Sequence, residues 1–499
     1  MSQIFSEFLE YYKEIKRYEE TAGIISWELH TEASQKASDN LIELQSFYEG
    51  RAFEMSTCDK MGDYLYKLLS DDEYESMPRE WQLSVKKLKR EYEENKNIPL
   101  EFYKEYSKTV AKAEDVWQNA KRNNDLDSFM PYLEKITDNL KEMCSYRRPD
   151  KNPYDLLLSD NEKGMEREQI DKIFEEIKKE LIPFVKKITE KNQPDRRKFT
   201  GHFDINKQKE LSVFLLEYIG FNMDAGILAE SEHPFTSGIT RDDVRLTNHY
   251  DETNIINPIF SIIHEGGHGI FEQNSDAKYF GTPLSSCSYM GLHESQSRFY
   301  ENILGRNINF WKPIYYKIKE LFPQYENIKL EEFYREINHV ERGLIRIDSD
   351  EVTYCFHIII RYEIERELFE GNIRISDIPK LWREKMNEYL GIEPSDDAKG
   401  VLQDSHWSGG AFGYFPSYLI GSVYDGMLYE RIEEELGSID KILSEENIKD
   451  ITRWLNENIH REGTSAQPKE LIETLCKREV SAKPLIKYFK KKYGELYGV

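Results

Sequence analysis

Residues 262–271 read Ile-Ile-His-Glu-Gly-Gly-His-Gly-Ile-Phe and contain the pattern His-Glu-x-x-His. On an α-helix, residues four positions apart lie on one face, one turn above the other. His264 and His268 can therefore direct both imidazoles at one metal ion, and Glu265 can reach a water on that ion. A catalytic zinc centre needs three protein ligands and an open position. The stretch predicts a helix with two of these ligands, so the third must come from another element.

A second helix is predicted at 291–302, ending near Gly305, and it holds the candidates for the third ligand. Glu294 lies far enough beyond the first motif for the chain to leave the first helix, form a loop and return. By spacing alone, His293 and Glu301 are alternatives to Glu294. The sequence therefore predicts a site with two histidines and one further ligand, most simply a carboxylate.

Three glycines interrupt the first motif, at positions 266, 267 and 269. Inside a helix each glycine costs about 1 kcal/mol relative to alanine. This destabilisation is explained if another part of the protein approaches the helix closely. The glycines therefore predict tight packing around the metal motif.

The composition is that of a folded, acidic protein. The chain has 499 residues, 39% of them hydrophobic and 13% aromatic, and a formal net charge of −24. This aromatic content argues against wholesale disorder. An acidic surface repels phosphate backbones, so the charge argues against nucleic acid as a partner.

The chain start lacks the basic segment and apolar run of a signal peptide. No apolar stretch reaches the roughly 20 residues that span a bilayer. The five scattered cysteines fit free thiols in a reducing compartment better than a disulfide framework. These features predict a cytoplasmic protein with no membrane partner.

Apolar residues at helical spacing predict a mostly α-helical protein. Two short segments, 198–203 and 243–250, partly alternate and carry β-branched or aromatic residues, which predicts one small β-sheet beside the metal motif. The segment 147–166 contains two prolines and is predicted to be a loop.

No linker rich in proline, glycine or serine divides the chain, so residues 1–499 are predicted to form a single domain. Within it we expect an N-terminal helical region at 1–145 and a catalytic region at 146–499.

An ordered series of motifs resembles the thermostable carboxypeptidase family, also called the carboxypeptidase Taq family. The series runs His233-Pro234-Phe235, Asp243-Val244-Arg245-Leu246-Thr247, His264–His268, His293-Glu294-Ser295-Gln296, Ile345-Arg346-Ile347-Asp348-Ser349-Asp350, and Gly400-Val401-Leu402-Gln403-Asp404-Ser405-His406-Trp407. Ser349 stands where the family usually has alanine, and Trp27-Glu28 stands where a Trp-Asp pair is expected. These departures affect the N-terminal details and leave the site motifs intact.

The resemblance implies a helical fold like those of neurolysin and angiotensin-converting enzyme, with a long groove under N-terminal helices, and a homodimer. It also implies His264, His268 and Glu294 as metal ligands, in agreement with the spacing. The family activity is removal of single residues from the C-terminus of peptides with broad specificity. The expected cofactor is one divalent ion, zinc or, as an alternative, cobalt.

The resemblance and the chemistry together suggest roles for further residues. Glu265 would act as general base. A free C-terminal carboxylate is best bound by arginine, which makes Arg346 and Arg245 candidates. The alternative for each is a salt bridge to a neighbouring acid such as Asp243 or Asp350.

Other residues in the recognised motifs complete the expected site. His406 and Tyr414 are candidates to stabilise the oxyanion of the tetrahedral intermediate, and Tyr414 is as readily explained as a packed aromatic residue. His233 and Gln403 are expected to contact substrate. Asp348 and Asp350 are candidates to accept the second N–H of the metal-bound histidines.

Two other functions remain open at this point. One is a metallo-oligopeptidase that cuts inside short peptides with the same ligands. The other is a non-catalytic peptide-binding protein on an inactive peptidase fold. The intact Glu265 argues against the second, because binding alone does not need a general base.

Overall fold

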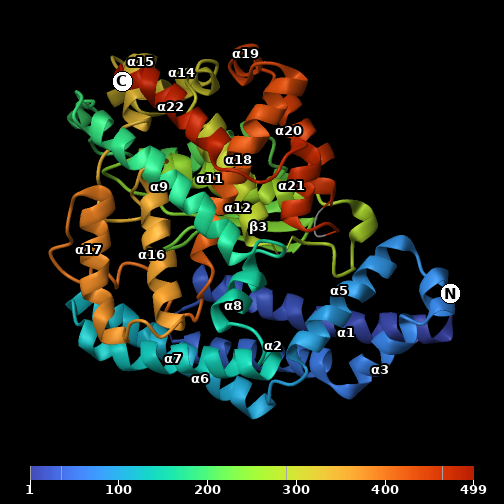
Figure 1. Ribbon diagram of the computed structural model, residues 1–499. Helices are drawn as coiled ribbons and strands as arrows, with labels where there is room; N and C mark the ends of the chain where they lie inside the picture. Colours follow the sequence, from blue (N-terminus) through green and yellow to red (C-terminus); the bar gives the residue numbers. More distant parts are fainter. Residues whose placement is uncertain (1, 35, 288, 463–464) are drawn as a thin grey trace.

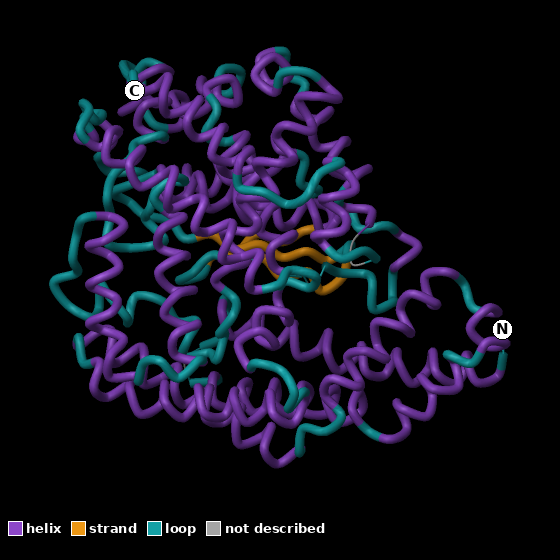
Figure 2. The backbone as a smooth tube through the Cα atoms, viewed as in Figure 1, coloured by secondary structure: helices purple, strands orange, loops and turns teal. Residues whose placement is uncertain are grey.

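The computed structural model describes residues 2–34, 36–287, 289–462 and 465–499. The chain is built of helices around one small sheet, as Figures 1 and 2 show. The prediction of a mostly α-helical fold with one small sheet is confirmed. In the described part of the chain, every helix is too short or too polar to cross a membrane.

The N-terminal helices lie together along one side of the molecule (Figure 1). They are α1 Gln3–His30, α2 Ser38–Thr57, α3 Asp59–Leu68, α4 Asp71–Ser76, α5 Arg79–Asn95, α6 Leu100–Asn123 and α7 Leu126–Arg147. The first five enclose their own apolar cluster, which includes Phe8 and Leu65. Helices α6 and α7 instead pack into the main core through residues such as Trp117 and Leu133.

The remaining helices form the larger body. They are α8 Pro153–Asn161, α9 Arg167–Thr189, α10 Ile205–Ile219, α11 Ile256–Gln273, α12 Met290–Arg298, α13 Ile308–Trp311, α14 Tyr315–Leu321, α15 Leu330–Ile337, α16 Tyr354–Phe369, α17 Ile378–Leu390, α18 Phe415–Leu436, α19 Ile439–Ser444, α20 Ile448–Asn458, α21 Pro468–Cys476 and α22 Lys483–Tyr497. A π-helical turn, Phe299–Leu304, continues α12. The predicted loop at 147–166 is wrong, because α8 begins there with Asn152 as its cap and Pro153 as its first residue.

The sheet has three strands, β1 Gly226–Glu230, β2 Thr236–Thr240 and β3 Asp243–Asn248, in the order β1-β3-β2. The central β3 runs parallel to β1 and antiparallel to β2. The prediction of a strand at 243–250 is confirmed. The one at 198–203 is wrong, because a 3₁₀ helix, Arg196–Phe199, occupies its start.

Helix α12 lies between α11 and α18, and glycines make this close packing possible. A Cβ added to Gly267 of α11 would lie 2.7 Å from Ser297 Cα and 2.8 Å from Gln296 O. A Cβ added to Gly421 of α18 would lie 2.9 Å from Gly291 O. The predicted close approach around the motif is therefore present: Gly267 faces α12, Gly266 faces α10, and Gly269 faces Phe221 and β3.

The start of α12 is also held by a buried carboxyl group. Glu162, directly after α8, accepts a hydrogen bond from Gly291 N at 2.6 Å. Its other oxygen, Oε2, has no hydrogen-bond partner among the described residues. Burial raises the pKa of Glu162 from 4.5 to about 7.

The packing of Gly267 predicts the effect of adding one methyl group. We expect Gly267→Ala to destabilise the protein by roughly 1–3 kcal/mol, because the new Cβ meets backbone atoms that cannot rotate away. Gly50→Ala is the matched control, since Gly50 lies inside α2 with no heavy atom within 4 Å of an added Cβ. Denaturant unfolding measures both, and an unchanged midpoint for Gly267→Ala would contradict the packing argument.

The raised pKa of Glu162 predicts a pH dependence of stability. Because the folded state holds the proton more tightly than the unfolded chain, this group stabilises the fold fully below about pH 4.5, and the contribution is lost as pH rises through about 7. Glu162→Gln should therefore gain stability relative to wild type between pH 5 and 8, by up to about 3 kcal/mol. Melting temperatures across this range test it, with the exposed Glu168→Gln as control. If the difference in melting temperature between variant and wild type stayed the same across this pH range, the raised pKa of Glu162 would be contradicted.

Candidate active site

Helix α11 carries the His-Glu-x-x-His motif and is buried along most of its length. His264 and His268 lie one turn apart, with ring centroids 4.9 Å from each other. The helix forms here because its apolar residues, such as Ile262, Ile263 and Ile270, have neighbours on nearly every side. Both imidazoles therefore project from a rigid, buried element.

Helix α12 brings Glu294 to these two rings. Glu294 Oε2 lies 3.6 Å from His264 Nε2 and 3.5 Å from His268 Nε2. In a tetrahedral zinc site with bonds of about 2.1 Å, ligand atoms lie roughly 3.4 Å apart. Within the described residues these three side chains are the one group of histidine, cysteine or carboxylate ligands close enough to hold a metal ion. Two neutral imidazoles and a carboxylate fit one divalent cation.

The two alternative third ligands lie one layer further out. His264 Nδ1 donates to Glu301 Oε2 at 2.9 Å. His268 Nδ1 lies 2.5 Å from His293 Nδ1, and His293 Nε2 donates to Glu272 Oε1 at 2.8 Å. Because His293 carries its proton on Nε2, where it donates to Glu272, its Nδ1 has no proton and accepts the hydrogen bond from His268 Nδ1. Glu301 and His293 thus orient the two rings so that both Nε2 atoms face Glu294.

The expectation that Asp348 or Asp350 accepts these N–H groups is wrong. Asp350 instead accepts hydrogen bonds from Val352 N, Thr353 N and Thr353 Oγ1 before α16. No feature of the sequence singles out Glu301, because its contact with His264 depends on how the π-helical turn after α12 orients its side chain.

Glu265 is held by a residue of the sheet. The hydroxyl of Thr236, the first residue of β2, donates to Glu265 Oε2 at 2.7 Å. Burial raises the pKa of Glu265, although the charge of His264 and the hydrogen bond from Thr236 oppose this shift. The small sheet therefore fixes the position of the carboxylate that follows the first histidine.

The electrostatics of the three clustered side chains follow from burial and mutual charge. Burial lowers the pKa of His268 to about 3 and favours a neutral imidazole. Burial also acts to lower the pKa of His264, but Glu294 and Glu301 outweigh it and raise the value to about 9. For Glu294, burial is outweighed by the two histidines, so its pKa is lowered. A carboxylate ion at this position is therefore the favoured form.

His406 and Tyr414 belong to one aromatic cluster, which also includes Phe415 and Tyr418. The ring centroids of His406 and Tyr414 are 5.6 Å apart, and His406 Nε2 shares a hydrogen bond of 2.9 Å with Tyr418 OH. Burial raises the pKa of Tyr414 to about 12, and the charge of Glu294 adds to this shift. Burial and Arg346 lower the pKa of His406 to about 3. At neutral pH the cluster therefore offers neutral O–H and N–H groups.

Arg346 is buried and paired with an acid that the sequence analysis did not consider for it. Its Nε donates to Asp404 Oδ1 at 2.9 Å, and its Nη1 donates to Tyr354 OH at 3.0 Å. Asp404 also accepts from Arg361, so one carboxylate balances two guanidinium groups. The salt bridge expected as an alternative exists, but its partner is Asp404 and not Asp350.

Gln403 holds Arg346 in place through the backbone. Its Oε1 accepts from Arg346 N at 2.9 Å, and its Nε2 donates to backbone carbonyls, including Leu344 O at 3.2 Å. The Gln403 amide therefore bonds to other residues of the protein and stabilises the segment around Arg346.

Arg245 and His233 lie on the sheet side of the site. Arg245 on β3 donates to both oxygens of Asp243 at 2.8 Å, as the salt-bridge alternative predicted, and stacks over Trp27 of α1. His233 precedes β2 and is exposed. Neither residue has a described contact with the three clustered ligands.

Three residues of this site were not predicted from the sequence: Thr236, Tyr418 and Glu272. Tyr418 follows Tyr414 by one helical turn, and this spacing was a usable signal. Thr236 and Glu272 give no such signal, because their contacts depend on how the sheet and loop pack against α11.

Comparison with known proteins agrees with this geometry. Residues 7–493 match the family model described as carboxypeptidase Taq (M32) metallopeptidase. The chain is 40% identical over 493 residues to carboxypeptidase 1 of Bacillus subtilis, covering 98% of each protein. It is 31% identical over 504 residues to thermostable carboxypeptidase 1 of Thermus thermophilus, covering 99% of each.

The fold agrees with a solved structure of the same kind. The crystal structure of the M32 carboxypeptidase from Deinococcus radiodurans superimposes with a TM-score of 0.95, at 30% identity and covering all of both chains. A match of this extent, together with the shared motifs, shows that the chain belongs to the carboxypeptidase Taq (M32) family and is a metallocarboxypeptidase.

Proposed function

We propose that His264, His268 and Glu294 bind the divalent ion of this metallocarboxypeptidase, and that the ion is zinc. The support is the distance from Glu294 Oε2 to the Nε2 atom of each histidine, which fits tetrahedral coordination, and the grouping of all three ligand atoms within 4.8 Å. When bound, such an ion lowers the pKa of water and polarises a peptide carbonyl. Cobalt suits the same ligands and is the alternative metal.

We propose that Glu265 is the general base and later the general acid. It accepts a proton from the attacking water and returns it to the nitrogen of the leaving residue. Two observations support this role. Glu265 directly follows a proposed ligand, and burial raises its pKa towards the range in which a carboxylate exchanges protons.

We propose that Tyr414 and His406 donate hydrogen bonds to the oxyanion of the tetrahedral intermediate. Both are neutral at physiological pH, and a neutral O–H or N–H is the donor that such a site needs. Tyr418 orients His406 through the shared hydrogen bond.

Arg346 is our proposed contact for the substrate carboxylate. Its Nε and Nη2 pair with Asp404 and its Nη1 donates to Tyr354, which leaves one hydrogen on each of Nη1 and Nη2 for a substrate. Gln403 positions Arg346, and Arg245 and His233 are proposed to contact more distant residues of the peptide. A homodimer in the cytoplasm remains our prediction for the working form of the enzyme.

The general-base role predicts the behaviour of one variant. Glu265→Gln keeps the size and shape of the side chain but removes its basicity, so we expect kcat to fall by about 10²–10⁴. Metal content, measured by elemental analysis, should stay at one ion per chain. Glu168→Gln serves as the surface control with unchanged kcat. Full activity of Glu265→Gln, or full activity of metal-free protein, would refute the mechanism.

The carboxypeptidase activity predicts a dependence on the substrate's end group. A peptide with a blocked N-terminus and a free C-terminus should lose its last residue, because a charged carboxylate is available to arginine. The same peptide with an amidated C-terminus should be cleaved at least about 100-fold more slowly. Mass spectrometry of the products measures both, and equal internal cleavage of the two peptides would favour the oligopeptidase alternative.

A further inference from the structure

A cavity lies outside the proposed active site. It has a volume of about 410 Å³ and is bounded by α13, α15, α18, α19 and α22. In Figure 1 these helices lie on the side opposite the N-terminal helices. None of the residues assigned above to metal, catalysis or substrate lines this cavity. Its function is therefore a separate question.

One wall of the cavity is aromatic. Tyr429 of α18 and Tyr488 of α22 pack with ring centroids 5.3 Å apart, and Tyr334 of α15 adds a third ring. The volume is large enough for a small ligand, such as an amino acid with a medium or large side chain. The wall thus favours a ligand with an apolar or aromatic group.

The rim carries charges of both signs. Lys491 and Glu495 lie on α22 and Asp440 lies on α19. Across the described ranges, none of these three side chains forms an ion pair within 4.0 Å. The carboxylate of Asp440 accepts one hydrogen bond, from the side-chain amide of Asn307 at 2.6 Å. A ligand with both a positive and a negative group would neutralise charges that the protein leaves unpaired.

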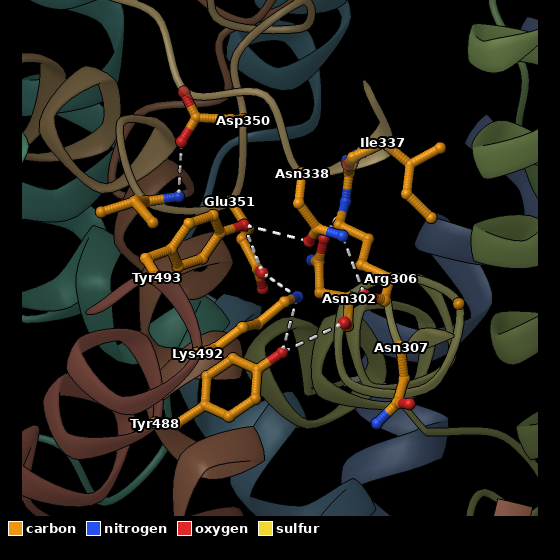
Figure 3. Close-up of polar contacts among 12 residues, drawn as sticks. Asn302, Arg306, Asn307, Ile337, Asn338, Asp350, Glu351, Tyr488, Lys492 and Tyr493 are labelled. Atoms are coloured by element: carbon orange, nitrogen blue, oxygen red, sulfur yellow. Dashed lines mark hydrogen bonds and ion pairs between the residues drawn. The ribbon is translucent and has the colours of Figure 1, made fainter. Parts of the chain in front are cut away.

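A buried lysine closes the inner end of the cavity. The Lys492 side chain is only 9% exposed, and its Nζ donates to Glu351 Oε1 and to Tyr488 OH (Figure 3). An ammonium group has three hydrogens, so one remains to donate to a ligand. Glu351 balances the charge of Lys492, so Lys492 offers the cavity a hydrogen-bond donor, and the neighbouring Lys491 offers the unpaired positive charge that suits a carboxylate.

The same lysine is linked to His264, a proposed metal ligand, through a series of hydrogen bonds and one ion pair. Tyr488 OH donates to Asn302 O, and Asn302 Oδ1 accepts from Arg306 Nε at 3.0 Å (Figure 3). Arg306 pairs with Glu301 Oε1 at 3.5 Å, and Glu301 accepts from His264. The cavity thus connects to the outer layer of the metal site through the π-helical turn.

We propose that this cavity binds a free α-amino acid with an apolar or aromatic side chain, and that its occupancy changes the rate of the enzyme. The carboxylate would meet Lys492 and Lys491, the ammonium group would meet Asp440 and Glu495, and the side chain would pack on the tyrosines. Amino acids of this class are what a carboxypeptidase releases. The coupling to rate rests on the proposed role of His264, whereas the binding site does not.

Calorimetry with L-phenylalanine and the metal-loaded full chain tests the site. We expect two sites per chain. In metal-loaded Glu265→Gln, which hydrolyses peptide too slowly to interfere, a peptide substrate should displace amino acid from only one of them. Lys491→Gln and Asp440→Asn should each weaken that site about 10-fold, and the double variant should abolish it. Lys483→Gln, an exposed lysine at the start of the same helix, is the control and should keep both sites.

Two half-ligands test the need for both charges. 3-Phenylpropionate and 2-phenylethylamine each lack one charged group and should bind the second site at least 10-fold more weakly than L-phenylalanine. The proposal is overturned if wild type shows one site, if peptide displaces all bound amino acid, or if the double variant binds like wild type. Glu265→Gln should keep the second site, so these outcomes are independent of the catalytic mechanism.

Kinetics at saturating peptide test the coupling. L-Phenylalanine should change kcat at least twofold in wild type and in Lys483→Gln. In the double variant it should leave kcat unchanged, apart from product inhibition at the active site. An unchanged kcat in wild type, with the second site occupied, would overturn the coupling.

Discussion

The site depends on the distance between two helices. Glu294 lies close enough to His264 and His268 for the proposed shared ion because α12 lies against α11 with backbone in contact at Gly267. A side chain at this position would separate the helices by part of an ångström, which is comparable to the tolerance of metal–ligand bonds. Gly267, which weakens α11 as an isolated helix, therefore makes the proposed ligand set possible.

Around this contact, the polar side chains of the site are held by neighbours from several elements: Glu301 holds His264, Glu272 holds His293 and Thr236 holds Glu265. Glu301 lies in the π-helical turn, Glu272 is near the end of α11, and Thr236 comes from the sheet. Further out, Asp404 balances Arg346 and Arg361 in a buried cluster. Removing one buried charge would leave its partner unpaired, so these groups stabilise the site as a set.

The sequence predicted those parts of the site that follow from local spacing. Two histidines on one helical turn, a second helix at 291–302 and the strand at 243–250 all follow from periodicity. The segment 198–203 was misjudged because a short alternating run has no unique conformation, and 147–166 because Pro153 can start a helix as well as end one. The partners of His264 and Arg346 depend on long-range packing, which no single sequence reveals.

The π-helical turn places Glu301 and Arg306 on the same side of the chain, although they are five residues apart. In a regular α-helix, five positions correspond to a rotation of roughly 140°, which would point the two side chains in different directions. Protein engineers often raise thermostability by making irregular helices regular. In this enzyme, such an edit between 299 and 304 would deprive the imidazole at 264 of a correctly oriented hydrogen-bond acceptor, so a better helix would make a poorer catalyst.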